Sequence, residues 1–582
     1  MERDIIRHLA EWKDAKNRKP LLITGVRQCG KTYAMLEFGK TYFEDVAYFN
    51  FEGNDGIKSI FEFDFDTDRI IDELGSVVRG RKIEPGKTLV IFDEIQECPK
   101  AITSLKYFCE NLRELHILCA GSLLGVVIRN ESVPFPVGKV DRIQMYPMNF
   151  PEFLRADGGQ NIYNALVRMQ NEASLTELYT VPLEKYLRSY YIVGGMPEAV
   201  NEWVETHDYE RIEKVQDNIL LDYGSDFSKH APKTEIAKLE WIWDSIPKQL
   251  AKENNKFMFS HVKEGKRAKD LEDSLEWLKN AGLIYRLELV EKPELPLALC
   301  ADGTHFKVYM CDVGLLRRKS GVDYKTILNG AETYRRFKGA LTENFVMTEL
   351  ISEGIKPYFW RSGNTAEVDF IIEHDSRVIP VEAKSEDNTK AKSYRQFCKR
   401  YDPSIGFRFS MKNIGIHNVE KTMTYSLPLY MIWRMKDFLE IHTKKAVYNE
   451  NKELKYMNEA ELASYMLTRI DEIKQLMDMI EPVIHHEVLL SAQTDKEIHD
   501  RYKTLKAGLK KDAHYVSLKK NQDSSVTNIY RQIVIPSIKE ADAWGFMVAA
   551  NAKIDFNFWG ALSEALYKLT KYYTKSDWER LL

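Results

Sequence analysis

The chain has 582 residues, a length that predicts several domains. Hydrophobic residues make up 44% and charged residues 29%, a balance ordinary for a soluble protein. The net charge of −4 excludes a polycation, so any contact with nucleic acid has to come from local basic patches.

The seven cysteines are scattered and form no C-x-x-C pair, which indicates a reducing compartment and argues against a structural zinc site. The first residues carry mixed charge and do not resemble a signal peptide. No apolar run approaches the length of a membrane span. We therefore expect a soluble cytoplasmic protein with no membrane partner.

The segment 25–32 (GVRQCGKT) fits the phosphate-binding pattern G-x-x-x-x-G-K-[ST]. It follows an apolar run at 21–23, typical of a buried parallel strand, and precedes a predicted helix at 33–38. There the glycines turn backbone N–H groups toward an anion, and the helix N-terminus adds partial positive charge. A chance turn of small residues is the alternative, which this context disfavours. We expect the loop to bind ATP through Gly25, Arg27, Gln28, Cys29, Gly30, Lys31 and Thr32.

Two carboxylates end a second apolar strand, at 88–92. Ligands lie at the carboxyl ends of parallel strands, so Asp93 is expected beside the phosphate loop. There Lys31 reaches the β- and γ-phosphates, while Thr32 and Asp93 hold Mg²⁺. Glu94 polarises the attacking water and acts as the catalytic base. An acidic helix cap is the alternative reading of the two carboxylates.

Two further strands complete the predicted core. The strand at 115–120 ends at Ser122, where a polar residue can sense the γ-phosphate, although a simple turn is the alternative. Another strand at 46–51 lies between the loop and Asp93 in the sequence. This order, with a glutamate after the metal aspartate, points to P-loop enzymes that hydrolyse ATP with a carboxylate base. Arg129 and Arg142 are equal candidates for an arginine finger.

The remaining segments divide into further predicted units. Residues 1–155 form an α/β domain with a mostly parallel sheet, and 156–225 form a helical lid. Helices followed by a β-hairpin predict a winged helix over 226–324. Basic residues at the start of its candidate recognition helix either touch phosphates or form a solvated face: Lys263, Lys266, Arg267 and Lys269. Residues 434–582 are predicted to form a helical domain of unassigned role.

A second constellation lies in the α/β unit at 325–433. Glu382 and Lys384 are two apart on a predicted strand and share a face. If this strand pairs with the one at 367–372 as a hairpin, Asp369 lies beside Glu382. Two carboxylates and the carbonyl of Ala383 make an oxygen site fit for Mg²⁺ or Mn²⁺. Lys384 then stabilises charge on a phosphate, and Glu343, in a predicted helix, completes the shell. An amphipathic hairpin of alternating charge is the alternative.

At this point the sequence resembles AAA-type P-loop ATPases that end in a PD-(D/E)XK nuclease-like module, the domain of unknown function 4143. The matching stretches lie in residues 1–433: 19–32, 92–96, 121–122, 194–197, 281–284, 312–316, 339–343, 367–370 and 381–384. The resemblance implies nucleotide roles for Lys31, Thr32, Asp93, Glu94 and Ser122. It implies nuclease-like roles for Glu343, Asp369, Glu382 and Lys384, with Glu343 and Lys384 counted among the catalytic residues.

Two functions remain open from the sequence. The first is an ATP-hydrolysing enzyme coupled to a nuclease-like module that acts on nucleic acid, with DNA favoured. The second is a regulatory ATPase whose nuclease-like module only binds nucleic acid or a protein partner. The carboxylate–lysine set favours the first, and the acidic net charge mildly favours the second. Oligomer formation is compatible with the sequence but is not specified by it.

Overall fold

A computed structural model describes residues 1–121, 124–127, 135–169, 174–252, 256–329, 335–363, 366–385 and 392–440. Residues 1–435 form one compact unit, which contains every element named below. Ser122, Arg129 and residues 441–582 of the expected helical domain lie outside the described residues.

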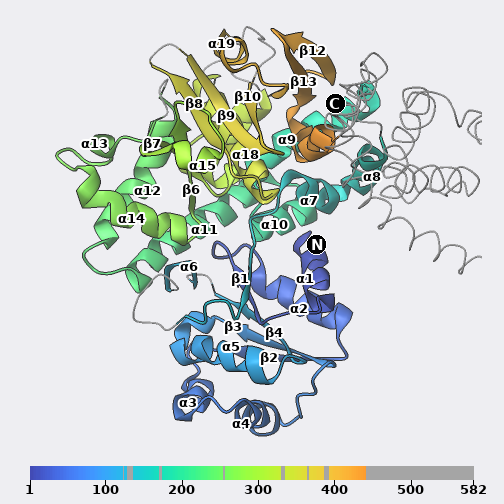
Figure 1. The fold of residues 1–582 in the computed structure, drawn as a ribbon, viewed down its shortest axis with the longest axis vertical. Helices are drawn as coiled ribbons and strands as arrows, with labels where there is room; N and C mark the ends of the chain where they lie inside the picture. Colours follow the sequence, from blue (N-terminus) through green and yellow to red (C-terminus); the bar gives the residue numbers. More distant parts are fainter. Residues whose placement is uncertain are drawn as a thin grey trace, which may run out of the picture. The chain divides into compact units, whose positions relative to one another are not determined.

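The N-terminal part contains a five-stranded parallel sheet with the order β2-β3-β4-β1-β5 (Figure 1). Its strands are β1 (Leu21–Thr24), β2 (Asp45–Asn50), β3 (Thr88–Asp93), β4 (His116–Ala120) and β5 (Asp141–Gln144). The four strands expected at 21–23, 46–51, 88–92 and 115–120 are thus confirmed. β4 lies between β1 and β3, so a single strand separates the end of β1 from Asp93.

Helices pack on this sheet because its central strands β3 and β4 are buried on both faces. On β3, Val90 and Phe92 join one core with helices α3 and α5, while α2 packs near the sheet as well. All six residues of β3 are buried, as expected for a central parallel strand. The helical elements here are α1 (Ile5–Asp14), α2 (Lys31–Tyr42), α3 (Asp55–Phe63), α4 (Thr67–Asp72), η1 (Glu73–Arg79), η2 (Ile95–Glu97), α5 (Pro99–Asn111) and α6 (Leu124–Val127).

Helices dominate the next segment. The helices expected over 156–225 are confirmed in the described residues, with a break between α9 and α10 at Gly194 and Gly195. The elements from here to the end of this helical region are α7 (Phe150–Leu154), η3 (Arg155–Gly159), α8 (Gln160–Arg168), α9 (Glu177–Val193), α10 (Pro197–Thr206), α11 (Tyr209–His230), α12 (Ile236–Leu250), α13 (Phe259–Val262) and α14 (Ala268–Asn280).

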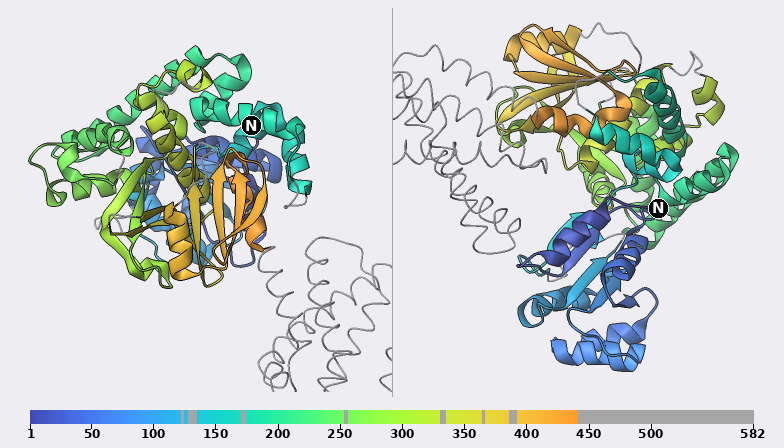
Figure 2. Two further views of the ribbon diagram at one scale, coloured as in Figure 1. Left: turned by 90° about the horizontal axis from the view of Figure 1, so that it is seen from above. Right: turned by 90° about the vertical axis from the view of Figure 1, so that its right-hand side faces the viewer.

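A second sheet has eight strands in the order β12-β13-β11-β10-β9-β8-β6-β7 (Figure 2). Its strands are β6 (Ile284–Val290), β7 (Ala301–Met310), β8 (Tyr358–Ser362), β9 (Ala366–His374), β10 (Arg377–Ala383), β11 (Ile405–Ser410), β12 (Gly415–Val419) and β13 (Thr422–Pro428). The helices that belong to this part are α15 (Leu297–Cys300), α16 (Val313–Lys319), α17 (Tyr324–Asn329), α18 (Arg335–Ser352), α19 (Lys392–Tyr401) and η5 (Leu429–Arg434).

The hairpin expected after the helices of 226–324 is present as β6 and β7, which pair antiparallel. However, β6 also pairs in parallel with β8, through Leu289 opposite Phe359 and Val290 opposite Trp360. The hairpin is therefore one edge of the large sheet, and its strand β7 can contribute side chains to a site on β9 and β10. The winged-helix assignment itself stays a prediction.

Candidate functional site

The phosphate loop, residues 25–32, turns between β1 and α2. Gly25 has a φ of +148°, and a Cβ at this position would lie 2.1 Å from the carbonyl oxygen of Met145. Gly30 caps α2 in the left-handed region, with a φ of +93°. Both positions therefore require glycine, one for space and one for backbone conformation. This confirms the strand, loop and helix expected from the motif.

The side chain of Lys31 folds back onto the backbone of the phosphate loop. Lys31 Nζ donates to the carbonyl oxygens of Gly25 at 2.9 Å and Val26 at 2.8 Å, and the residue is buried. These acceptors are neutral, so a triphosphate would be a stronger partner for the ammonium group. The geometry is that of a loop ready to receive an anion.

The two residues expected to hold Mg²⁺ lie together. Thr32 Oγ1 donates to Asp93 Oδ2 at 2.7 Å, although the two are 61 residues apart in the chain. Tyr48 on β2 donates to the same oxygen at 2.9 Å. Burial, with Asp93 adding to it, raises the pKa of Tyr48, so the hydroxyl stays protonated. A hydroxyl and a carboxylate at this distance fit the inner and outer shells of an ATP-bound Mg²⁺.

Glu94 follows Asp93 in a left-handed backbone conformation, with a φ of +50°. This turn separates the direction of Glu94 from that of Asp93. Gln96 Nε2 donates to Glu94 Oε2 at 2.5 Å. Gln96 is itself confined, because a Cβ at Gly121 would lie 2.0 Å from Gln96 Oε1. The carboxylate assigned as catalytic base is thus fixed by a neighbour that packs against the end of β4.

Helix α11 contacts the phosphate loop from outside the first sheet. The carboxylate of Asp226 pairs with the guanidinium of Arg27, and Asp222 Oδ2 accepts from Gln28 Nε2 at 2.7 Å. Between them, the hydroxyl of Tyr223 donates to the carbonyl oxygen of Arg27 at 3.1 Å. Two side chains expected to contact nucleotide are therefore bound to carboxylates of a helix about 195 residues away in sequence.

The motif glycines at 194 and 195 meet Asp312 at a buried joint. Asp312 Oδ2 accepts from the N–H of Gly195 at 2.5 Å, and Oδ1 accepts from Leu315 at 2.7 Å. A Cβ on Gly194 would lie 2.2 Å from the Asp312 carboxylate, so glycine is required there. Burial raises the pKa of Asp312 to about 6, although the backbone N–H donors act in the opposite direction. This joint fixes α16 to the break between α9 and α10.

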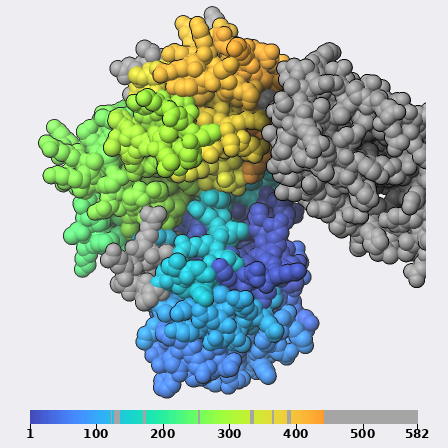
Figure 3. Space-filling view, in the orientation of Figure 1, coloured from blue at the N-terminus to red at the C-terminus, as the bar shows by residue number. Residues whose placement is uncertain are grey.

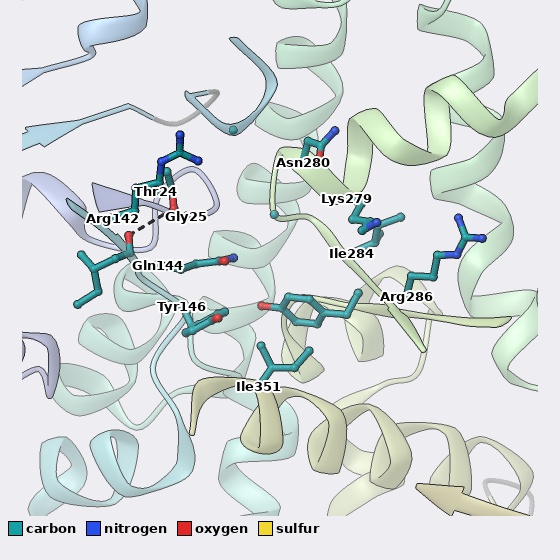
Figure 4. Close-up of a pocket in the computed structure, with 14 residues that line it drawn as sticks. Thr24, Gly25, Arg142, Gln144, Tyr146, Lys279, Asn280, Ile284, Arg286 and Ile351 are labelled. Atoms are coloured by element: carbon teal, nitrogen blue, oxygen red, sulfur yellow. Dashed lines mark hydrogen bonds between the residues drawn. The ribbon is translucent and has the colours of Figure 1, made fainter. Parts of the chain in front are cut away.

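A cavity of about 570 Å³ lies next to the phosphate loop. Figure 4 shows its wall, which Thr24 and Gly25 form on one side and Ile284 and Arg286 on another. Tyr285 also lines the cavity. The remaining lining residues come from β5, α6, α14, the start of β6 and α18: Gly125, Arg142, Ile143, Gln144, Tyr146, Lys279, Asn280, Gly282, Ile284 and Ile351. The arginine-finger candidate Arg142 therefore faces this cavity, with its guanidinium 4.3 Å from the ring centroid of Phe135.

The second expected site is also assembled. β9 and β10 pair antiparallel, with Val381 opposite Phe370, so the expected hairpin is confirmed. Asp369 Oδ2 accepts from the N–H of Ala383 at 2.9 Å. Lys384 Nζ lies 3.4 Å from Asp369 Oδ2 and 2.6 Å from Glu382 Oε1. One ammonium group thus bridges both carboxylates.

Glu343 on α18 lies in the same neighbourhood but has different partners. Its Oε2 accepts from the hydroxyl of Tyr309 at 2.7 Å and lies 3.4 Å from Lys307 Nζ. The same Lys307 Nζ lies 2.7 Å from Glu367 Oε1. We call the six residues Lys307, Glu343, Glu367, Asp369, Glu382 and Lys384 the carboxylate–lysine cluster.

The cluster changes the protonation of its members. Burial, together with the charge of Asp369, raises the pKa of Glu382 to about 7, although Lys384 acts in the opposite direction. Burial alone would lower the pKa of each lysine. The carboxylates beside Lys307 and Lys384 outweigh this effect and raise both pKa values, so both side chains stay charged.

In the described part of the chain, no group of three or more His, Cys, Asp and Glu side chains is placed to hold a metal ion. Glu343 is engaged by Tyr309 and Lys307 and does not join a three-carboxylate shell. What remains for a divalent cation is the pair Asp369 and Glu382, with the adjoining carbonyl of Ala383. The metal site thus stays a prediction, and it rests on two carboxylates instead of three.

Of the basic residues of the candidate recognition helix, Lys263, Lys266 and Arg267 precede α14 and Lys269 lies in its first turn, in a part of the chain that is coloured green in Figure 3. Lys263, Arg267 and Lys269 are exposed, and Lys266 is partly so. Further along α14, Glu272 and Glu276 pair with Arg286 and are therefore not a free acidic face. The exposed basic end is compatible with phosphate contact, which stays a prediction.

Sequence reasoning missed several partners of both sites. Lys307 and Tyr309 are two apart on β7, as Glu367 and Asp369 are on β9, so strand alternation places each pair on one face. Alternation cannot show that β7 and α18 meet at Glu343. Asp222 and Asp226 are four residues apart, so a helix places both carboxylates on one face. Nothing in the sequence links that face to the phosphate loop.

Three parts of the chain match models of known protein families. Residues 17–154 match the model of an AAA domain. This part of the chain is similar to AAA domains. Residues 338–430 match the domain of unknown function DUF4143, as the resemblance implied, and residues 184–326 match another, DUF8612. No curated protein matches the chain.

Similar solved structures include one protein of Pyrococcus abyssi and two of Aeropyrum pernix. A Walker-type ATPase of Pyrococcus abyssi is 15% identical with a TM-score of 0.35, over 55% of this chain and 95% of its own. The ORC2 protein of Aeropyrum pernix, in ADPNP–ADP complexes, is 12% identical with a TM-score of 0.29, over 56% and 91%. The ORC1 protein of Aeropyrum pernix in complex with DNA is 14% identical with a TM-score of 0.23, over 56% and 93%.

None of the helices in the described ranges combines the length and the apolar character that a membrane span needs.

Proposed function

We propose that the AAA domain binds and hydrolyses ATP with Mg²⁺, using Lys31 for the phosphates and Glu94 as the base. The observation that carries this proposal is the 2.7 Å contact between Thr32 and Asp93, because it brings the two halves of a Mg²⁺ site together beside the phosphate loop. Glu94 lies next to this pair and is fixed by Gln96. In the reaction, Glu94 accepts a proton from the water that attacks the γ-phosphate.

We propose further that the carboxylate–lysine cluster binds a divalent cation and cleaves nucleic acid in an ATP-dependent manner. Asp369 and Glu382 supply carboxylate oxygens, which Mg²⁺ and Mn²⁺ prefer. The bound cation would polarise a phosphodiester and lower the pKa of a water molecule. Lys384, half-exposed at the edge of this pair, would stabilise the charge that develops on the phosphate.

Coupling between the two activities has a physical route through α11. This helix contacts the phosphate loop through Asp222, Tyr223 and Asp226. It also contacts α16 through Asp217, which pairs with Arg318 at 2.6 Å. A triphosphate that recruits Arg27 competes with Asp226 for the guanidinium, so nucleotide binding changes the forces on α11. The joint at Asp312 then connects α16 with the helices that precede the second sheet.

A cleavage assay tests the proposal for the cluster. Single- and double-stranded DNA and RNA are incubated with Mg²⁺ or Mn²⁺, with and without ATP. We expect the parent to cut at least one substrate and Asp369→Ala and Lys384→Ala to cut none. Lys412→Ala, a change on the loop after β11 and outside the cluster, serves as the matched lysine control. Equal cutting by all four proteins would reveal a contaminant and refute the assignment.

A second candidate function is a regulatory ATPase whose DUF4143 region binds nucleic acid or a protein partner without cutting it. The observation that favours it is the bridge made by Lys384, which offsets half of the negative charge of the two carboxylates. If no substrate is cut under any condition while ATP is hydrolysed, this second function is supported.

A further inference from the structure

Two lysines divide the carboxylates of the cluster into two pairs, and the two lysines differ in their exposure to solvent. Lys384 bridges Asp369 and Glu382, and 38% of its side chain is exposed. Lys307 bridges Glu343 and Glu367, and only 1% of its side chain is exposed. The carboxylates themselves do not account for this difference, because Asp369 and Glu382 are 12% and 3% exposed, whereas Glu343 and Glu367 are 18% and 30% exposed. The difference lies in the lysines: a cation at the first pair can displace Lys384 into water, whereas Lys307 is enclosed.

The buried lysine is held from several sides. Lys307 Nζ lies 2.7 Å from Glu367, 3.4 Å from Glu343 and 5.2 Å from the ring centroid of Phe359. Tyr309, two residues further along β7, donates to Glu343 at 2.7 Å. Displacing this ammonium group would leave two partly buried carboxylates without their counter-charge, whereas the ammonium group of Lys384 already borders solvent.

The pair beside Lys384 also has unused capacity for a ligand. Glu382 is 2% exposed, yet its Oε2 has no hydrogen-bond partner in the described part of the chain. A buried carboxylate oxygen without a donor is unfavourable unless something else binds it. A divalent cation is the partner that would satisfy this oxygen and Asp369 together.

We propose that the cluster takes one divalent cation, at Asp369 and Glu382, and that Lys307 is a built-in cation standing where a second metal ion would bind. This inference rests on the metal site proposed above. With all groups ionised, the four carboxylates and two ammonium groups of the cluster sum to −2, and Arg408, opposite Glu382 on β11, adds a positive charge. A second divalent cation would therefore leave a large positive excess.

In this proposal Lys307 and Lys384 have different roles at the site. Lys307 holds Glu343 and Glu367 out of the metal shell and ties β7 to α18 and β9. Lys384 loses its two carboxylates when the cation binds, so its ammonium group is released to face the phosphate of a substrate. Lys307 is in this scheme a positioning residue, and the sheet edge formed by β7 belongs to the site.

Manganese titration of the full chain without nucleotide tests the inference, with bound and free Mn²⁺ separated by electron paramagnetic resonance. The variants are Asp369→Ala, Glu367→Gln and Lys307→Met. We expect one bound ion in the parent, none in Asp369→Ala, and one in Glu367→Gln with an affinity within about threefold of the parent. A ligand of the ion would instead lose tenfold or more when altered. Lys307→Met frees the second pair, and we expect it to bind two ions.

The outcomes separate this inference from the function on which it rests. A parent that binds no Mn²⁺, or an Asp369→Ala variant that binds as the parent does, refutes the metal site itself. Two ions in the parent, or loss of the ion in Glu367→Gln, refutes only the role of Lys307. Lys307→Met with a single ion also counts against that role. If Lys307→Met does not fold, Glu367→Gln decides, because it keeps the lysine.

Discussion

The phosphate loop and the carboxylate–lysine cluster both hold a lysine in place, but with opposite kinds of partner. Lys31 donates to two neutral backbone carbonyls, those of Gly25 and Val26. Lys384 lies between two carboxylates, Asp369 and Glu382. The first lysine lacks a counter-charge among these contacts, whereas the second already has one.

This difference indicates what each site requires from a ligand. An anion that reaches Lys31 replaces weak hydrogen bonds with charge-assisted ones, so binding is favourable from the start. A cation that reaches the cluster has to displace Lys384 before it can use Asp369 and Glu382. Removal of the lysine should therefore weaken binding at the first site and strengthen it at the second.

The largest effect is expected for Lys31→Ala, which removes the only side-chain ammonium of the phosphate loop. We expect high-affinity ATP binding to be abolished, because the β- and γ-phosphates lose their main cation. Titration with a fluorescent ATP analogue measures this. An affinity equal to that of the parent would show that the loop does not bind the triphosphate as assigned.

Glu94→Gln is expected to keep ATP binding and to slow hydrolysis by two or more orders of magnitude, the loss typical of a positioned base. Phosphate release at saturating ATP is the measurement. Gln96→Ala is the matched second variant, because it leaves the carboxylate but removes its 2.5 Å contact. We expect a smaller loss, about tenfold. Parental turnover in Glu94→Gln would assign the base to another residue.

Lys384→Ala should bind Mn²⁺ more tightly than the parent, by about tenfold, while cleavage is lost. The competing ammonium is gone, and two neighbouring carboxylates without a cation attract a metal strongly. Calorimetric titration without nucleotide gives the affinity. Weaker binding in this variant would mean that Lys384 supports the metal site instead of competing for it, and the contrast with Lys31 would fail.

Asp226→Asn should raise the affinity for ATP by about fivefold, because it removes a negative charge next to the phosphate loop and releases Arg27. The same fluorescent titration measures the change. Adding Asn218→Asp to this variant restores the net charge of α11, so a gain in affinity that persists in the double variant is local to the Arg27 pair. An affinity that falls in Asp226→Asn would show that the pair supports the bound loop.

The smallest effect concerns the joint at Asp312, whose pKa is raised to about 6 by burial. The folded state then binds a proton more tightly than the unfolded chain does. The stability from this group is complete below about pH 4 and is lost as the pH rises through about 6. We expect the pH dependence of the thermal midpoint over this window to be weaker in Asp312→Asn. An unchanged dependence would assign the effect to other groups.

The sequence predicted the nucleotide site more completely than the cluster, for a physical reason. Eight consecutive residues define the phosphate loop, and parallel strand ends bring Asp93 to it, so local pattern and sheet rules suffice. Strand alternation also placed Asp369, Glu382 and Lys384 together.

The cluster depends in addition on how distant elements pack. Lys307 reaches Glu343 only because β6 pairs with β8 and β7 continues that sheet. Helix α11 likewise reaches Arg27 and Gln28 through tertiary packing. Hydrophobic periodicity predicts that such helices and strands exist but does not specify which faces meet. The β6–β7 hairpin likewise forms one edge of the second sheet, because β6 pairs with the distant strand β8.

The most direct test of the central claim measures ATP hydrolysis and metal-dependent cleavage in the same samples of parent, Lys31→Ala and Lys384→Ala. We expect the parent to show both activities, with cleavage stimulated by ATP. Lys31→Ala should lose hydrolysis and the stimulation by ATP, while Lys384→Ala should lose cleavage and retain hydrolysis. Cleavage that responds to ATP in Lys31→Ala as it does in the parent, or that persists in Lys384→Ala, would contradict two coupled sites in this chain.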